Sequence, residues 1–422
     1  MRAMRDSGVE WIGEMPEEWT LRHFKYLAEV RANLVSPYDY PELVEIDPDN
    51  IESDTGKLLN VRTVEEVGAI SSKQHFNKGQ ILYSKIRPGL NKVVMAPSDG
   101  LCSADMYPIT AHCEERWLLY MMRSDCFVHQ ATEVSNMRVK MPKVNVDELG
   151  AIQIPTPPLD EQRRIADYLD ARCADIDAVS QKVRSEIDLL GEYRKSVIYE
   201  AVAKGLDKGV PMRDSGIEWI GEIPKGWDTL KGKYVFEQRN EKGNRRSLRL
   251  LSPTQNYGVI PQDMYEELTG MRPVKLKQDT DLNTLKTIHK GDYCISLRSF
   301  QGGFEYSEYE GVVSPAYQVF YPIINVFDGY YRHLFKTSAF IDKMNSYTMS
   351  MRDGKNIAFD DFGNTLIPIP PIDEQRRIAD YLDARCADID AIIAKKRRQL
   401  DVLADYRKSL IYECATGKRE VA

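Results

Sequence analysis

Two stretches of the sequence place acidic residues at spacings that catalysis could use. The segment Arg352–Lys355, "RDGK", sets a carboxylate close to a lysine of the sort that nucleases use. An Asp-x-Lys without a second positioned acid is more typical of a solvated turn. Asp175 with Asp177, repeated as Asp388 with Asp390, lie two apart in helical sequence. Because residues two apart on a helix do not face one another, we expect these pairs on its solvent side.

Other catalytic signatures are absent from the sequence. There is no Gly-x-x-x-x-Gly-Lys-Ser/Thr loop, no Gly-x-Gly-x-x-Gly, no Gly-x-Ser-x-Gly elbow and no Asn/Asp-Pro-Pro-Tyr/Phe tetrapeptide. The seven cysteines form no Cys-x-x-Cys pair, and the six histidines show no metal-ligand spacing. We therefore expect a non-catalytic chain with no metal or cofactor of its own, and reduced thiols in a cytoplasmic protein.

Binding of nucleic acid is better supported than catalysis, although the net charge is −7. Charge acts locally, and three runs contain no acidic residue: Val67–Ser98, Val134–Val146 and Lys242–Gln262. Their Lys and Arg side chains can neutralise phosphates, and Arg, Asn and Gln can contact base edges. A single such run is as compatible with a solvated basic loop, but three in an acidic chain favour DNA.

The candidate DNA contacts come from these runs and from two later segments. They are Lys73, Lys78, Lys85, Arg87, Asn91, Lys92, Arg138, Lys140, Arg245, Arg246, Arg249, Arg298, Gln301, Arg352 and Lys355.

The elements that position these residues are set by a tandem duplication. The stretch "PPLDEQRRIADYLDARCADIDA" (Pro157–Ala178) returns with one change at Pro370–Ala391, an offset of 213 residues. An opening motif, "MRDSGVEWIGEMPEEW" (Met4–Trp19), returns at Met212–Trp227, an offset of 208. Between these copies the similarity fades. Two domains with the same scaffold and different surfaces are therefore predicted.

Each diverged domain has a mixed α and β pattern. Short β-branched or aromatic runs such as "GQILYSKI" and "GVVSPAYQVFYPI" alternate with turn residues. Helical patches follow near Glu114–Gln130 and Asp328–Met344. Both domains end in proline-rich, strand-like exits that prepare a helix start. The expected fold class is α+β, with two pseudo-symmetric α/β-type domains joined by two long helices.

The copied stretches begin long helices with a heptad-like apolar seam. Roughly 40 residues at 1.5 Å per residue make a rod of about 60 Å. The periodicity indicates that the two helices pack on each other but leaves their relative direction open. The seam residues are Ile165, Leu169, Ile176, Val183, Ile187, Leu190, Val197, Ile378, Leu382, Ile389, Ile393, Leu400, Leu403 and Leu410.

The boundaries follow from these signals. We expect a first domain at 1–156, a first helix at 157–204, a second domain at 205–369 that opens with a linker at 205–211, and a second helix at 370–422. No run of about 18 apolar residues occurs, so no membrane span is expected. The start of the chain lacks the pattern of a signal peptide.

The chain runs from an opening motif through a diverged domain to a copied helix, and then repeats all three. In this order of elements it resembles the DNA-specificity subunit of type I restriction-modification systems. The resemblance is carried by "SGVEWIGEMPEEW" and "SGIEWIGEIPKGW", by "PPLDEQRRIADYL" and "PPIDEQRRIADYL", and by "KGDYCISLRSF" and "GVVSPAY" in the second domain. It covers essentially the full length. The paired helix starts are the specific part, whereas the recognition loops carry no transferable motif.

The resemblance implies a set of functions and partners. Each diverged domain would be a target-recognition domain that reads one half of a bipartite sequence in double-stranded DNA. The two helices would form an antiparallel coiled coil that docks two methyltransferase subunits, which bind S-adenosylmethionine. In a restriction complex, two motor-nuclease (restriction) subunits would add cleavage that uses ATP and Mg. No membrane partner is implied.

Two other readings of the sequence stay open. The chain could be a non-enzymatic protein–protein scaffold with tandem interaction domains, which a salt-dependent gel shift on DNA would distinguish from a DNA-binding subunit. A divergent nuclease built on "RDGK" is the third reading, which metal-dependent cleavage by the isolated chain would support.

Overall fold

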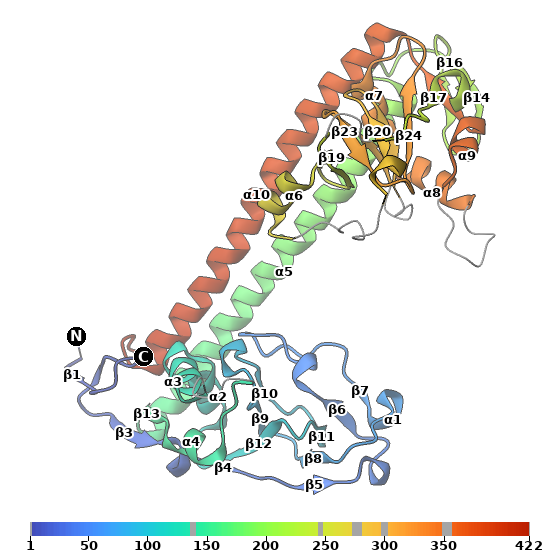
Figure 1. Ribbon diagram of the computed structural model, residues 1–422. Helices are drawn as coiled ribbons and strands as arrows, with labels where there is room; N and C mark the ends of the chain where they lie inside the picture. Colours follow the sequence, from blue (N-terminus) through green and yellow to red (C-terminus); the bar gives the residue numbers. More distant parts are fainter. Residues whose placement is uncertain are drawn as a thin grey trace. The chain divides into compact units, whose positions relative to one another are not determined.

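The structure, a computed structural model, describes residues 2–135, 141–243, 248–271, 281–296, 303–347 and 357–421. It divides into two compact units (Figure 1): unit 1 is Met1–Arg184 with Lys396–Ala422, and unit 2 is Ser185–Lys395. Each unit thus combines one globular domain with part of both long helices. The consecutive domain boundaries expected from the sequence stay a prediction.

Unit 1 is built on two sheets. A four-stranded antiparallel sheet has the order β10-β9-β12-β4, and a five-stranded sheet has the order β5-β8-β11-β6-β7, in which only β11 and β6 run parallel. Strands β1 and β2 form a hairpin in the opening motif, and β13 pairs with β3. The strands are β1 (Met4–Asp6), β2 (Glu14–Pro16), β3 (Thr20–His23), β4 (Ala28–Val30), β5 (Leu34–Val35), β6 (Val44–Ile46), β7 (Arg62–Thr63), β8 (Lys73–Phe76), β9 (Ile81–Ser84), β10 (Val93–Met95), β11 (Gly100–Cys102), β12 (Met106–Ala111) and β13 (Gln153–Thr156).

The helices of the unit 1 domain are α1 (Val64–Val67), α2 (Glu115–Arg123), α3 (Asp125–Ser135) and α4 (Val146–Ala151). The single helical patch expected near Glu114–Gln130 is therefore two helices. They break at Ser124, which is extended and whose hydroxyl donates to the carbonyl of Met121 at 2.5 Å. Such local side-chain bonds compete with helix propagation.

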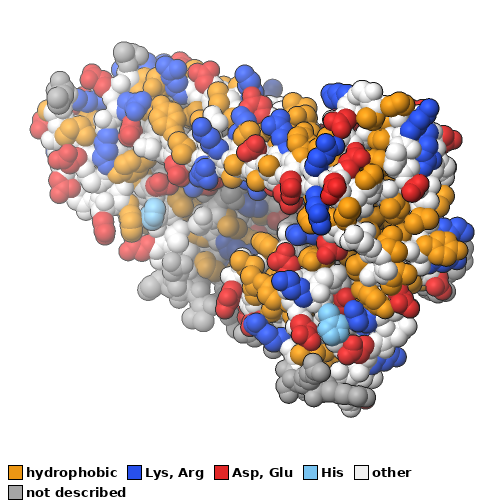
Figure 2. Space-filling model, turned by 90° about the horizontal axis from the view of Figure 1, so that it is seen from above, with side chains coloured by type: hydrophobic (Ala, Val, Ile, Leu, Met, Phe, Trp, Pro, Cys, Tyr) orange, Lys and Arg blue, Asp and Glu red, His pale blue; other side chains and the backbone are white. Residues whose placement is uncertain are grey.

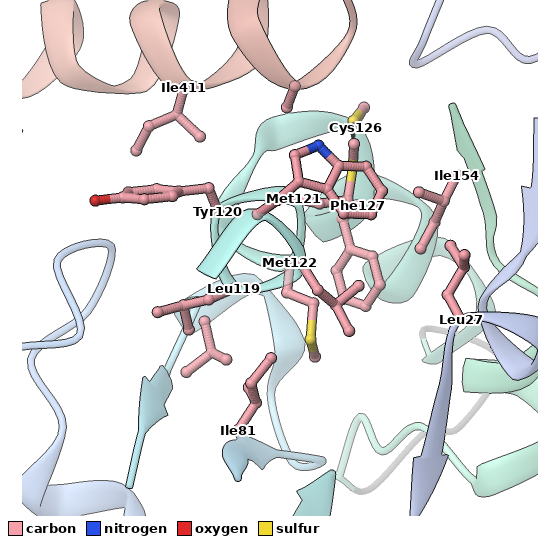
Figure 3. Packing of buried hydrophobic residues seen from close by; sticks show 14 of the residues in the cluster. Leu27, Ile81, Leu119, Tyr120, Met121, Met122, Cys126, Phe127, Ile154 and Ile411 are labelled. Carbon is pink, nitrogen blue, oxygen red and sulfur yellow. Dashed lines mark hydrogen bonds between the residues drawn. The ribbon is translucent and has the colours of Figure 1, made fainter. Parts of the chain in front are cut away.

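The core of unit 1 lies around α2. Figure 3 shows Tyr120 and Met121 of α2 on the side of Ile411 from the second long helix, while Ile81 of β9 lies on the opposite side of α2. Five consecutive residues from Leu118 to Met122 are buried. A helix that is apolar all round is one that packs on every side, so α2 joins the sheet to the long helices.

Unit 2 has smaller sheets. Its four-stranded antiparallel sheet has the order β17-β24-β21-β22, and its four antiparallel pairs are β14-β15, β16-β25, β18-β19 and β20-β23. The strands are β14 (Met212–Ile217), β15 (Gly221–Pro224), β16 (Asp228–Lys231), β17 (Phe236–Gln238), β18 (Leu251–Thr254), β19 (Gly258–Pro261), β20 (Lys286–Ile288), β21 (Tyr293–Ile295), β22 (Phe304–Tyr306), β23 (Gly311–Val313), β24 (Gln318–Pro322) and β25 (Leu366–Ile369).

The domain helices of unit 2 are α6 (Gln262–Thr269), α7 (Asp328–Leu334), α8 (Ser338–Ser346) and α9 (Phe359–Asn364). Their core is aromatic: the Phe236 ring lies 5.4 Å from the Phe320 ring and 5.3 Å from the Tyr331 ring, edge to face in both cases. Edge-to-face pairs at this separation add to the stabilisation from burial. Here too the expected helical patch is interrupted, because Thr337 caps the start of α8 through the amide of Phe340.

The long helices are α5 (Leu159–Lys204) and α10 (Ile372–Ala415). In unit 1 the first part of α5 packs on the last part of α10, with Leu169 and Cys173 in one core with Leu410 and Cys414. In unit 2 the last part of α5 packs on the first part of α10. The helices are therefore antiparallel in each unit, which confirms the predicted fold class.

The fourteen seam residues all lie at buried or half-buried positions. Those that are buried are Ile165, Leu169, Ile176, Val183, Val197, Ile378, Leu382, Ile389 and Leu410. Those that are half-buried are Ile187, Leu190, Ile393, Leu400 and Leu403. Among the helices that the structure describes, none is long and apolar enough to cross a membrane.

Candidate nucleic-acid interface

The copied "DEQ" at each long-helix start holds the opening motif of the same half. In unit 1 the indole N–H of Trp19 donates to Glu161 Oε2 at 3.0 Å. In unit 2 the indole of Trp227 donates to Glu374 Oε2 at 2.9 Å. Both tryptophans are buried, so each indole N–H needs a partner. The glutamate at the start of each long helix therefore anchors the opening motif.

The glutamine of the same triplet joins the long helix to the domain. Gln162 Oε1 accepts from the amide of Glu114, the N-cap of α2, at 3.1 Å. Gln375 repeats this bond with the amide of Phe327, the N-cap of α7, at 2.8 Å. A side-chain acceptor at a helix N-terminus satisfies an amide that the helix cannot. Both units thus fix their central domain helix to the rod in the same way.

The acidic pairs near the middle of each copied stretch are exposed, as expected from the sequence, but one member of each pair also bonds to the other long helix. In unit 1 Asp177 of α5 accepts a hydrogen bond from Arg407 of α10, which is buried. In unit 2 Arg194 of α5 lies 3.4 Å from Asp390 of α10. These pairs occupy equivalent positions in the repeat and set the antiparallel register in each unit. Half-exposed ion pairs of this kind contribute modestly to stability but favour one register.

Most described candidate DNA contacts of unit 1 are already bonded within the protein. Lys73 is 8% exposed, and its ammonium lies 2.5 Å from Glu45 Oε1 and 3.0 Å from Asp47 Oδ2. Burial acts to lower the pKa of Lys73, but the hydrogen bonds to these carboxylates raise it overall. Lys73 therefore offers a phosphate little net charge.

Three further candidates bond to backbone carbonyls or to neighbouring side chains. Lys85 donates to the carbonyl of Ala104 at 2.5 Å, and Lys92 donates to that of Pro48 at 2.7 Å. Asn91 is buried and donates to Asp54 at 3.1 Å. These bonds hold the loops that carry the three residues.

Lys78 and Arg87 differ from the other candidates in unit 1. Both are exposed, and neither side chain makes a hydrogen bond or ion pair with the residues that the structure describes. They flank β9 at opposite ends. In unit 2 the exposed Arg249 is paired with Asp263. The remaining candidates lie outside the described residues: Arg138, Lys140, Arg245, Arg246, Arg298, Gln301, Arg352 and Lys355.

Charge on the surface is mixed. In the face shown in Figure 2, Lys and Arg side chains are interspersed with Asp and Glu. Because positive and negative side chains alternate in this way, local exposure and pairing identify candidate phosphate contacts better than net charge does.

Unit 2 contains an open groove of about 940 Å³ between the turn at Gln255–Gly258, α7, the start of α8 and the long helices. Burial raises the pKa of Glu305 in this groove to about 7. The cations of the groove are matched by acids. The pairs are Lys336 with Glu305, Arg332 with Glu308, Arg194 with Asp390 and Lys195 with Glu192. His333, whose pKa is lowered by burial, bonds to Asp383. We therefore do not assign the groove to phosphate.

A second surface was not predicted from the sequence. Apolar side chains stay exposed on the long helices at positions that the repeat relates to one another. In unit 1 these are Val179, Val402 and Tyr406, and in unit 2 they are Ile392, Leu189 and Tyr193. We call them the unit 1 trio and the unit 2 trio. Their signal in the sequence is an apolar residue that recurs in both copies but lies off the seam.

Comparison with known proteins places these features in a family. The chain matches the profile described as "Type I restriction modification DNA specificity domain" over residues 17–188 and 224–401. It is 37% identical over 190 residues to the EcoDI specificity subunit of Escherichia coli, a match that covers 45% of this chain and 43% of that protein. It is 24% identical over 427 residues to the putative MjaX specificity subunit of Methanocaldococcus jannaschii, covering 97% and 96% of the two chains.

Solved structures show the same fold. A chain reported in work on complex assembly and conformational transition of the type I R-M system has a TM-score of 0.65 at 19% identity, covering 96% of this chain and 99% of that one. The HsdS subunit from Thermoanaerobacter tengcongensis has a TM-score of 0.51 at 18% identity, covering 96% and 98%.

Proposed function

Because this chain belongs to the family of type I restriction-modification DNA specificity domains, we propose that it recognises a bipartite target in double-stranded DNA and docks two methyltransferase subunits. One diverged domain reads each half of the target. The chain itself is non-catalytic and cytoplasmic. S-adenosylmethionine binds the methyltransferase partners, and a restriction complex adds two motor-nuclease subunits that use ATP and Mg.

The repeated frame supports this proposal most directly. The Trp–Glu, Gln–amide and Asp–Arg contacts recur in both units at equivalent positions, while the domains they hold have different sheets. A frame held constant beneath two different domains suits two different half-sites.

The activity of the assembled complex tests the proposal. We expect no methylation by the purified chain and adenine methylation of a bipartite sequence once its cognate methyltransferase subunit is added. Binding to that sequence should fall on the order of 10³-fold between 50 and 200 mM salt, because phosphate contacts release counterions. Sequencing that detects methylated adenines gives the target. Methylation by the chain alone, or salt-independent binding, would contradict the proposal.

The trios support docking of two identical partners. The unit 1 and unit 2 trios occupy equivalent positions of the repeat, and each combines two aliphatic side chains with one tyrosine. Tyr193 also accepts a hydrogen bond from Arg385 at 3.1 Å, which holds its ring at the surface. Exposed apolar and aromatic side chains are typical of protein interfaces. The same trio presented twice fits one kind of partner bound twice.

Charged substitutions in one trio should remove one partner. The double variant Leu189→Asp and Ile392→Asp in unit 2 is expected to bind one methyltransferase subunit where the wild type binds two, because a buried unpaired carboxylate opposes association. Native mass spectrometry measures the stoichiometry. Val179→Asp with Val402→Asp should have the same effect through unit 1. The exposed neighbour Ala394→Asp is the control, and if it releases the partner equally, the unit 2 trio is not the docking surface.

A protein scaffold remains the second candidate function, and the trios alone would also fit it. Weak and salt-insensitive binding to every duplex tested would favour it over DNA recognition.

A further inference from the structure

One loop of unit 1 is held in an unusual conformation. Arg87 has φ 48° and ψ 60°, and Asn91 has φ 48° and ψ 50°, so both lie in the left-handed region. Between them the short 3-10 helix η4 (Pro88–Leu90) packs on α3. Non-glycine residues adopt this conformation when the surrounding structure imposes it, and such positions concentrate at functional sites.

Backbone bonds on both sides hold Arg87 in place. Its N–H donates to the carbonyl of Pro142 at 2.8 Å, and its carbonyl accepts from the amide of Leu90 at 2.9 Å. The amide of Val144 donates to the carbonyl of Lys85 at 2.9 Å, which joins the two segments. We call residues Lys85–Asn91 with Met141–Lys143 the Arg87 wedge.

The base of the wedge is fixed to the long helix. The backbone amide of Asp54 donates to the carbonyl of Asn91 at 3.2 Å, and the side-chain amide of Asn91 donates to Asp54 Oδ1 at 3.1 Å. Lys408 of α10 lies 3.0 Å from the other carboxylate oxygen of Asp54. Through Asp54, the rod and the wedge of unit 1 are thus connected by direct polar bonds.

The exposed part of the wedge combines apolar and cationic side chains. Leu90 is 44% exposed and Met141 is 47% exposed. The amide of Leu90 donates to the carbonyl of Arg87, and Met141 directly precedes Pro142, whose carbonyl accepts from the amide of Arg87. Neither wedge segment contains an acidic residue. Burial and the charge of the neighbouring Lys143 lower the pKa of Lys85. The acidic residue nearest to Lys143 in this region is Asp105, whose Oδ1 lies 3.9 Å from the Lys143 ammonium.

From this geometry we infer that the Arg87 wedge enters a groove of double-stranded DNA, with Leu90 and Met141 against a base step and Arg87 and Lys143 at the flanking phosphates. The inference rests on the proposed function. Apolar side chains that press on a base step partly unstack it, and the cost depends on the sequence. Unit 1 would then read part of its half-site through deformability as well as through hydrogen bonds. The absence of acids within the wedge favours a polyanion over a protein partner.

A fluorescent base in the target tests the inference. The wild-type complex with methyltransferase subunits is bound to duplexes that carry 2-aminopurine at successive steps of the half-site read by unit 1. We expect a several-fold rise in fluorescence at one step, because unstacking removes quenching. The variant Leu90→Ala with Met141→Ala should lose this rise and about ten-fold in affinity for the target, while its affinity for random duplex stays within two-fold. Arg87→Ala should keep the rise but make the slope of log K against log salt shallower by about 0.9.

Matched controls separate the outcomes. Ile70→Ala removes another exposed apolar side chain of unit 1 and should change neither signal. The inference is contradicted if the wild type binds its target without a rise in fluorescence at any step. It is also contradicted if the Leu90→Ala with Met141→Ala variant keeps both the rise in fluorescence and the affinity for the target. A wild-type complex that binds no DNA overturns the proposed function itself, which is a different result.

Discussion

Trp227→Ala is expected to destabilise unit 2 by about 3–5 kcal/mol, the range for truncating a buried tryptophan. The indole is 1% exposed, its N–H donates to Glu374 at 2.9 Å, and its ring meets that of Tyr330 edge to face at 6.3 Å. The truncation therefore leaves a cavity and removes the partner of a carboxylate at the start of α10. Urea denaturation gives the free energy of unfolding, and hydrogen exchange shows which unit has lost protection.

The duplication supplies controls for this substitution. Trp19→Ala should have the same effect in unit 1, because Trp19 is equally buried and donates to Glu161 at 3.0 Å. Trp11 belongs to the same opening motif but is only half-buried, stacks on His129 and donates to Glu133 at 3.2 Å on the surface. Trp11→Ala should cost about 1 kcal/mol or less. Equal losses from Trp11→Ala and Trp19→Ala would show that the Trp–Glu contact does not anchor the motif.

The elements that repeat were the most predictable from sequence. The long helices follow from the seam and the lack of internal proline, and all fourteen seam positions are buried or half-buried. The strands around Ile81–Ser84 and Gln318–Pro322 follow from β-branched and aromatic runs bounded by turn residues. The periodicity left the direction of the helices open, since it says which faces are apolar and not which ends meet.

Contacts between distant segments were not predictable. Lys73 fits a basic, acid-free run, yet its partner Glu45 lies on β6, separated from β8 by β11 in the five-stranded sheet. Local sequence carries no information on that sheet order. Nor could the sequence show that Arg87 is left-handed, because the bond that imposes this conformation comes from Pro142. Pairing across the fold thus decides which of the basic residues in one run keep their charge available.

The acidic residues of the copied stretch show the same limit. Spacing alone placed Asp177 and Asp390 on the solvent side, and each is indeed about half exposed. Their Arg partners lie on the other helix, in a register that only the packed pair defines. The exposed apolar trios are the converse, because their residues recur off the seam in both copies of the sequence, but the sequence alone did not show that they face solvent.

Removing one heptad from each long helix should shorten the gap between the two half-sites while leaving both half-site sequences unchanged. Suitable deletions are residues 180–186 of α5 and 393–399 of α10, which lie on each helix between the Asp177–Arg407 and Arg194–Asp390 pairs and leave both trios intact. After them Ile176 stands four residues from Ile187, and Ile389 stands four from Leu400, so the seam keeps its period.

The size of the change follows from helix geometry. Seven residues at 1.5 Å correspond to about 10 Å, the length of about three base pairs, which sets an upper limit on the change. Mapping methylated adenines compares the targets of the wild-type and deleted complexes. Deletion from α5 alone is the control, because it puts the two seams out of register and should abolish assembly. An unaltered gap in the double deletion would mean that the spacing of the half-sites is not set by the long helices, and the antiparallel pair would then serve partner docking alone.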